Sequence, residues 1–152
     1  MVFEMTPRTS PRPNDCGATC MQMFLSYYGI EVDLETLIKD CNTSITGSTG
    51  RDLMDCGRKY GLDMRCFQEV DPDSTGHEGK ELYGDILNQD RPAIIWWMYN
   101  HWVMFGGVND AGKVVIYNPD RGRYSISKGT FKSFYTNISI TNGIPEDLPD
   151  EV

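Results

Sequence analysis

Hydrophobic residues near the start of the chain recur at the spacing of an α-helix. Within residues 17–28, the apolar positions fall at i, i+3, i+4 and i+7, namely Met21, Phe24, Leu25 and Tyr28. Asn14 or Asp15 can cap the start of this helix, and Gly29 can end it. The pattern predicts a helix with one buried face, and Cys16 lies at its N-terminal tip.

Two more helices are predicted in the first half of the chain. The second begins after Asp33, and the third begins after Ser48 or Thr49, since these side chains can accept hydrogen bonds at a helix N-terminus. Gly61 follows the third helix, as is typical of a helix end. Residues 63–68 then alternate between apolar and polar positions, which predicts a short strand.

The second half of the chain has the pattern of strands. Residues 69–80 are polar, contain Gly and Pro, and are predicted to form a loop. Beyond the Arg91-Pro92 pair, apolar segments predict four strands, at residues 93–99, 101–108, 113–118 and 123–126. Helices that precede strands in this way indicate an α+β fold, in which a helical N-terminal half packs on a C-terminal antiparallel sheet.

The length of 152 residues fits one compact domain. We expect an irregular N-terminal arm at residues 1–15, the domain itself at residues 16–141, and an acidic, flexible tail at residues 142–152. The arm is rich in Pro, Arg, Ser and Thr and shows no periodicity, and the tail contains two prolines. One functional site on one scaffold is therefore expected.

Charge and targeting signals narrow the functional classes. Lys and Arg total 14 against 22 Asp and Glu, so the formal net charge is −8, which disfavours nucleic acids and anionic membranes as partners. The N-terminus lacks the apolar core of a signal peptide, and the longest apolar run, at residues 93–99, is too short to cross a bilayer. We expect a cytoplasmic protein without a membrane segment.

Cysteine and histidine usage bears on redox state and on metal binding. The five cysteines, without an export signal, indicate reduced thiols, and their odd number leaves at least one unpaired. No CxxC motif occurs and the chain has only two histidines, so the ligand spacing of a zinc site is missing. We expect no metal and no other cofactor.

Cys16 is the first candidate for catalysis. A helix N-terminus provides unpaired N–H groups and a partial positive charge, both of which stabilise a thiolate. The neighbouring Asp15 opposes a second negative charge unless its side chain points away, so Cys16 needs a histidine partner. Of the two histidines, His101 opens a strand between apolar stretches, whereas His77 lies in the polar loop. His101 is the better candidate.

Asn118 is the candidate that orients His101. The turn signal NDAG allows Val108 to pair with Lys113, and this register places Val103 opposite Asn118. His101 and Asn118 are then diagonal neighbours on one face of the hairpin, with Cβ atoms roughly 7 to 8 Å apart. A one-residue bulge would move them to opposite faces.

Cys, His and Asn together can act as a thiol hydrolase. The thiolate attacks a carbonyl carbon, the imidazolium protonates the leaving amine, and the amide holds the orientation of the ring. Each residue also has a plainer explanation, since a Cys at a helix start is usually a small buried residue and an Asn before Pro is ordinary turn chemistry. Taken singly, none of the three predicts this chemistry.

Four blocks of the sequence resemble the bacteriocin-processing peptidases. In order they are NDCGATCMQMFLSYYGIEVDLETL, TGRDLMDCGRKYGL, NHWVMFGGV and VVIYNPDRG, and they run from about Pro13 to Phe134. The resemblance implies a papain-like cysteine peptidase that removes leader peptides after a small-residue, Gly-Gly-like site. On this resemblance Cys16 matches the nucleophile, His101 the histidine, and Asn118 the acidic residue that usually precedes Pro.

The sequence departs from this family at two positions. The third residue of the triad is Asn118 rather than the usual Asp, and no Gln occurs five or six residues before Cys16, where the family has its oxyanion donor. Ser10 and Pro11 occupy those places. Loss of a preorganised donor costs about 10²- to 10³-fold in rate, so either Ser10, Asn14 or a backbone N–H replaces it or activity is weak or lost.

The resemblance also implies partners, and it leaves alternatives open. Family members act on peptide or protein substrates and are often fused to ABC transporters, so a transporter or secretion partner is expected for a chain that looks free-standing. A glutamine deamidase or acyltransferase would use the same Cys-His-Asn chemistry on another substrate. The missing Gln favours a third hypothesis, in which the protein is a catalytically weak family member that mainly binds peptides.

Overall fold

The N-terminal half of the chain folds into helices, as its hydrophobic spacing predicts. The computed structural model describes residues 1–68 and 86–143. A short 3-10 turn, η1, leads into three helices: η1 (Pro13–Asp15), α1 (Cys16–Tyr27), α2 (Leu34–Asp40) and α3 (Gly50–Lys59). The side chain of Asp33 caps α2, and that of Thr49 caps α3 in a capping box. These two predicted caps are confirmed, whereas Asp15 occupies the N-cap position of α1 without a side-chain hydrogen bond to the helix.

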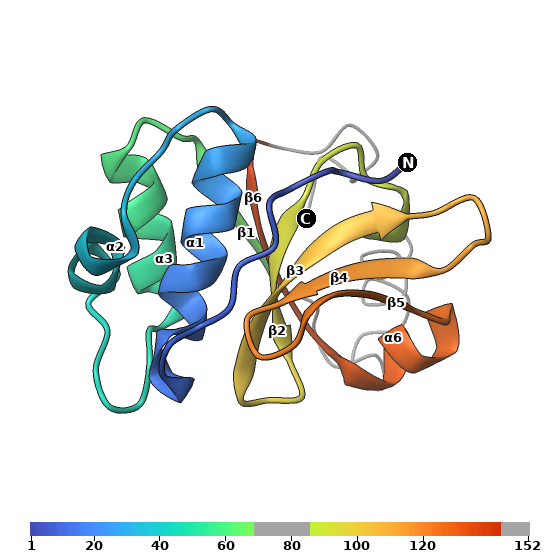
Figure 1. The fold of residues 1–152 in the computed structure, drawn as a ribbon. Helices are drawn as coiled ribbons and strands as arrows, with labels where there is room; N and C mark the ends of the chain where they lie inside the picture. The colour runs from blue at the N-terminus through green and yellow to red at the C-terminus, as the bar shows by residue number, and fades with distance from the viewer. Residues whose placement is uncertain (69–85, 144–152) are drawn as a thin grey trace.

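The strands form one antiparallel sheet in the order β1-β6-β2-β3-β4-β5 (Figure 1). Their bounds are β1 (Met64–Gln68), β2 (Ala93–Trp97), β3 (His101–Val108), β4 (Val114–Asn118), β5 (Gly122–Ile126) and β6 (Tyr135–Asn142). The predicted α+β class is therefore confirmed, although β1 comes from the helical half and lies at a sheet edge. The predicted loop at residues 69–80, with His77, and most of the predicted tail lie outside the described residues.

The hydrophobic pattern does not predict α6 (Lys128–Phe134) or β6. Helix α6 spans seven residues, and Phe131 is its one fully buried side chain, so it is too short to show a helical period. Strand β6 has the polar sequence YTNISITN, yet it lies between β1 and β2 in the sheet. Pairing with strands distant in sequence overrides its weak local preference.

Both faces of the sheet are buried. Neighbouring residues of its central strands point to opposite faces, and each face packs against its own set of hydrophobic residues. Ile94 and Met104 pack with the helices α1 to α3 in one core cluster, whereas Ile95 and Phe105 pack with Phe131 of α6 in a second. Figure 1 shows α1, α2 and α3 on one side of the sheet and α6 on the other. The molecule thus has three layers.

The N-terminal arm runs along the sheet before it reaches α1 (Figure 1). The backbone N–H of Phe3 donates to the carbonyl of Gly106 at 2.9 Å, and the Phe3 side chain is buried. Further along, the N–H of Ser10 donates to the carbonyl of Pro119 at 2.8 Å. The arm therefore ties the first helix to the turn after β4.

The hairpin of β3 and β4 differs from its predicted register at the turn. Val108 pairs with Val114, so the predicted pairing of Val108 with Lys113 is wrong. A register shift lies between Phe105 and Val108, where Gly107 has φ of 95° and pairs with the N-terminal arm. Only glycine adopts this backbone conformation readily, which explains the bulge at this point.

The bulge restores the predicted register nearer the site. Beyond it, Met104 pairs with Tyr117, which is the alignment that places His101 and Asn118 on one face. His101 is the first residue of β3, and Asn118 is the last residue of β4. The two side chains therefore meet at the same end of the sheet, because the turn and the bulge each shift the register by one residue in opposite senses.

Candidate active site

The structure brings three predicted residues together at the end of the sheet. Cys16 is the first residue of α1, whose N-terminus lies on the same side of the molecule as the β2–β3 turn (Figure 1). The Nε2 atom of His101 lies 2.8 Å from the Oδ1 atom of Asn118, and the Cys16 side chain interacts electrostatically with the His101 ring. Cys16 and Asn118 are each 6% exposed, so the site is largely shielded from solvent.

The hydrogen bonds of Asn118 determine which nitrogen of His101 carries a proton. Its Oδ1 atom accepts from the backbone N–H of Asp120 at 2.9 Å, and its Nδ2 atom lies 3.1 Å from the hydroxyl of Tyr124. A backbone N–H can only donate, so the amide atom that faces it must be the oxygen. The Nε2 atom of His101 therefore donates to Asn118, which leaves Nδ1 for Cys16.

The electrostatics favour the protonated form of His101. Burial lowers the pKa of the ring, but hydrogen bonds to Cys16 and Asn118 and the charges of Cys16 and Asp120 outweigh burial and hold the pKa above its usual value. The His101 side chain is 13% exposed, so these interactions are only weakly screened. An imidazolium that faces the Cys16 sulfur is the arrangement that a thiolate nucleophile requires.

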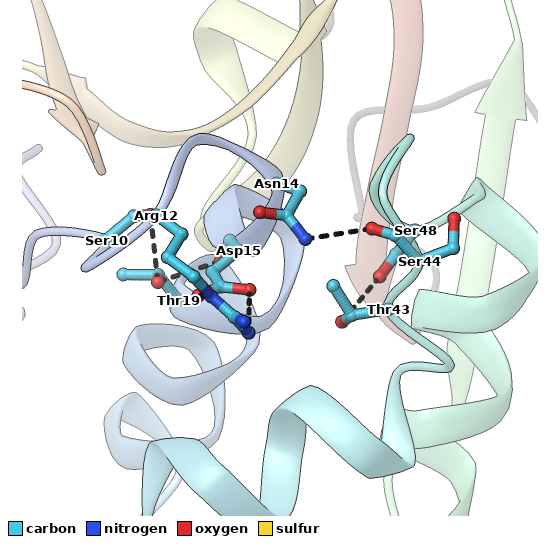
Figure 2. Close-up of polar contacts among 8 residues, drawn as sticks. All are labelled: Ser10, Arg12, Asn14, Asp15, Thr19, Thr43, Ser44 and Ser48. Carbon is cyan, nitrogen blue, oxygen red and sulfur yellow. Dashed lines mark hydrogen bonds and ion pairs between the residues drawn. The ribbon is translucent and has the colours of Figure 1, made fainter.

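Asp15, which precedes Cys16, is neutralised by an ion pair. Its carboxylate is fully buried and accepts two hydrogen bonds from the guanidinium of Arg12, at 2.9 and 3.1 Å (Figure 2). This contact raises the pKa of Arg12. The negative charge of Asp15 is thus compensated from the arm, and its carboxylate faces Arg12. Arg12 and Asp15 are three residues apart in the sequence, and this spacing could have predicted the ion pair.

The two candidate oxyanion donors lie on the arm and differ in their hydrogen bonds (Figure 2). The hydroxyl of Ser10 donates its one hydrogen to the Oγ1 atom of Thr19, at 3.0 Å. The Nδ2 atom of Asn14 donates to the carbonyl of Ser44 at 2.9 Å, and an amide nitrogen has a second hydrogen to give. Both side chains lie within six residues of Cys16 in sequence.

Two hollows adjoin the site. A cavity of about 470 Å³ is lined by His101, Asn118, Asp120 and Tyr124, among others. A groove of about 700 Å³ lies on the helical side, between residues 42–54 and the side chains of Trp96, Trp102 and Ile138. Next to Cys16, Gly17 packs so closely on Ser48 and Trp102 of that groove that a Cβ atom would lie 3.3 and 3.4 Å from them. The residue that follows Cys16 therefore packs on two residues that line the groove.

The family model described as the Peptidase C39 family matches residues 8–143. This chain belongs to the peptidase C39 family. Its sequence is 23% identical over 127 residues to the colicin V secretion/processing ATP-binding protein CvaB of Escherichia coli, covering 83% of this chain and 16% of that protein. It is 24% identical to the lactococcin-G-processing and transport ATP-binding protein LagD of Lactococcus lactis subsp. lactis, covering 82% and 17%. The C39 chain thus spans about a sixth of the length of these relatives.

Solved structures resemble this C39 domain over nearly its whole length. A double glycine motif protease from an AMS/PCAT transporter, in complex with the leader peptide, has a TM-score of 0.79 at 25% identity and covers 91% of both chains. The peptidase domain of Streptococcus ComA has a TM-score of 0.74 at 17% identity, covering 91% and 96%. The papain-like fold and the family predicted from the four sequence blocks are confirmed, and the family is one of cysteine peptidases.

Sequence reasoning misses the residues that surround Asn118. Asp120 lies two residues after it, with its Oδ2 atom 3.5 Å from Nε2 of His101, and Tyr124 comes from β5. The order Asn-Pro-Asp places Asp120 in the turn that follows β4, and this spacing was the available signal.

Within the described ranges, no helix is both long enough and apolar enough to span a membrane.

Proposed function

We propose that this domain cleaves a peptide bond after a small-residue, Gly-Gly-like site, with Cys16 as nucleophile, His101 as acid and base, and Asn118 as the residue that orients the ring. The observation that carries the proposal is the 2.8 Å contact between Nε2 of His101 and Oδ1 of Asn118, together with the electrostatic interaction of the same ring with Cys16. Family membership supports the same reaction class.

In the first step the Cys16 thiolate attacks the carbonyl carbon of the scissile bond and forms a tetrahedral oxyanion. His101 then gives its Nδ1 proton to the leaving amine, the C–N bond breaks, and a thioester to Cys16 remains. In the second step His101 takes a proton from water, the hydroxide attacks the thioester, and the thiolate leaves. Throughout, Asn118 accepts from Nε2 and keeps Nδ1 directed at Cys16.

The oxyanion needs donors that are already in place. The backbone N–H of Cys16, at the first position of α1, is the first donor that we propose. We propose Asn14 as the second, since its Nδ2 has a hydrogen left after its bond to Ser44, whereas the hydroxyl hydrogen of Ser10 is engaged with Thr19. Ser10 stays a candidate only if that bond breaks when substrate binds.

The groove beside Cys16 is the proposed site for the leader. It is lined by Trp96, Trp102 and Ile138 on the sheet side and by polar residues of the 42–52 segment on the helical side. Apolar walls with backbone groups at one edge suit an extended peptide that carries apolar side chains. The solved double glycine motif protease, which was crystallised with the leader peptide, supports this substrate class.

The decisive experiment is cleavage of a defined peptide. A synthetic leader that ends in Gly-Gly and continues into a short cargo is incubated with the purified domain, and the products are identified by mass spectrometry. We expect a single cut after the second Gly, and none with the Cys16→Ser variant. A peptide in which Val-Val replaces Gly-Gly is the matched substrate control and should stay intact.

The same assay separates the alternatives. Ammonia release or acyl transfer from a glutamine peptide, without cleavage of the leader, would select a deamidase or acyltransferase. Leader binding without cleavage, together with a Cys16 that does not react with alkylating agents at neutral pH, would select a binding member. The observation that favours the binding member is that Ser10 occupies the sequence position where the family has Gln.

We also propose a transporter as the partner and the cytoplasm as the location. The relatives CvaB and LagD are described as secretion or transport proteins that bind ATP, and this chain matches one sixth of their length. A peptide that is processed before export would meet the domain on the side where ATP is available.

A further inference from the structure

Asp120 lies beside His101 and has no part in the steps described above. Its Oδ2 atom is 3.5 Å from Nε2 of His101, the same nitrogen that donates to Asn118. The Asp120 side chain is 57% exposed, whereas that of His101 is 13% exposed. The carboxylate therefore reaches the ring from the solvent side of the site.

The turn after β4 fixes Asp120 and Asn118 relative to each other. The backbone N–H of Asp120 donates to the Oδ1 atom of Asn118 at 2.9 Å, and the N–H of Arg121 donates to the Asn118 carbonyl at 3.0 Å. The N–H of Ser10 holds the intervening Pro119 through its carbonyl. One rigid turn thus presents an amide oxygen and a carboxylate to the same ring nitrogen.

We propose that Asp120 supplies the negative charge that Asn118 lacks, and so stabilises the imidazolium form of His101 opposite the Cys16 thiolate. Asn118 accepts the Nε2 hydrogen but is neutral, whereas a carboxylate within about 4 to 6 Å of an imidazole favours its charged form. Asp120 is a positioning residue, because it acts through His101. The inference builds on the roles proposed for Cys16 and His101.

Apart from the Cys16 thiolate itself, the other polar groups around the ring do not provide a negative charge. Cys16 faces His101 from α1, Asn118 faces it from β4, and the Tyr124 hydroxyl stands behind Asn118. Arg121 lines the same cavity and carries the opposite charge. Within the described part of the chain, Asp120 is the carboxylate that acts on the ring.

A first test follows the ring of His101 by NMR during a pH titration in the Cys16→Ser background, where no thiolate forms. Asp120→Asn keeps the shape and the backbone hydrogen bond, and we expect it to move the His101 midpoint to lower pH. Asp110→Asn, an exposed carboxylate in the β3–β4 turn, removes the same net charge and should leave the midpoint in place. A midpoint that does not respond to Asp120→Asn, or responds equally to Asp110→Asn, overturns the proposal.

A second test uses turnover of the leader peptide. Asp120→Asn should lower kcat by about 2- to 5-fold at neutral pH with KM unchanged, as fits a half-exposed charge pair. The Asn118→Asp background places a carboxylate directly on Nε2. In that background, the fold-loss in kcat caused by Asp120→Asn should be less than half of the loss in the wild-type background. Equal losses in both backgrounds would overturn the proposal. If the wild-type domain cleaves no leader peptide, the proposed function fails, and the NMR titration still decides the role of Asp120.

Discussion

His101 and Asn118 are 17 residues apart in sequence, yet the Nε2 atom of one lies 2.8 Å from the Oδ1 atom of the other. This contact fixes the tautomer of the ring, because the same amide oxygen also accepts from a backbone N–H that can only donate. It therefore leaves Nδ1 as the ring nitrogen available for the proton transfer that we propose with Cys16. The predictions below depend on this assignment and on the contacts around it.

Cys16 should react with iodoacetamide before the other four cysteines at pH 7. It alone combines a helix N-terminus with a histidine, whereas Cys20, Cys41 and Cys56 are buried and burial holds the pKa of Cys20 well above its usual value. Mass spectrometry of the labelled peptides measures the order. Cys66 is exposed and gives the background rate, so His101→Ala should slow labelling of Cys16 and leave Cys66 unchanged. Labelling of Cys66 before Cys16, or equal labelling of the five cysteines, would contradict the prediction.

Replacing His101 should cost more activity than replacing Asn118. In the proposed mechanism, His101→Ala removes the group that transfers the proton and should lower kcat by about 10²- to 10⁴-fold, whereas Asn118→Ala removes only the residue that orients the ring. Steady-state kinetics on the leader peptide give kcat for each variant, and circular dichroism checks that both are folded. If folded variants lose activity equally, Asn118 does more than orient the ring.

Introducing the missing glutamine should raise turnover. Ser10→Gln restores a long donor side chain six residues before Cys16, and a donor added to the Cys16 N–H and the proposed Asn14 amide stabilises the transition state with little effect on substrate binding. We expect kcat to rise and KM to stay the same, or cleavage to appear where none was measurable. Ser10→Ala is the control, because it also removes the hydrogen bond to Thr19. Turnover at or below the wild-type level would mean that another residue already fills the oxyanion site.

Gly107 should tolerate alanine less well than Gly112 does. Both glycines have positive φ, at 95° and 77°, but a Cβ atom at Gly107 would also collide with the backbone carbonyl of Met1, whereas a Cβ at Gly112 meets nothing within 4 Å. We expect Gly107→Ala to lower the free energy of unfolding by about 2 to 3 kcal/mol, and Gly112→Ala by about 1 kcal/mol. Urea titrations measure both. Equal losses would mean that the arm does not pack on the bulge in solution.

The sequence predicts the helical layer well, since capping residues and apolar spacing are local signals. Asp33 and Thr49 cap the helices that follow them, and His101 and Val108 are the first and last residues of β3, as predicted. Strand β6 could not be predicted in this way, because its burial comes from pairing with β1 and β2, which are far from it in sequence.

The proximity of His101 and Asn118 follows from two register shifts that cancel. The turn after Val108 is one residue longer than the NDAG signal indicates, and the bulge at Gly107 removes that offset. The glycines at 106 and 107 are a local signal for a bulge, but its place and its effect on the register also depend on the N-terminal arm, which approaches the strand there. The sequence therefore places these two residues on the correct face while giving the wrong pairs at the turn.

The arm that runs along the sheet has a practical consequence for dividing this protein in two. A cut between residues 68 and 86 separates a fragment with Cys16 from a fragment with His101 and Asn118. The two fragments would still share a β-ladder between β1 and β6 and the backbone hydrogen bonds of the arm to Gly106 and Pro119. The chain thus contains its own dimerisation elements for a split enzyme, in which thiol reactivity or peptide cleavage would report that two fusion partners have met.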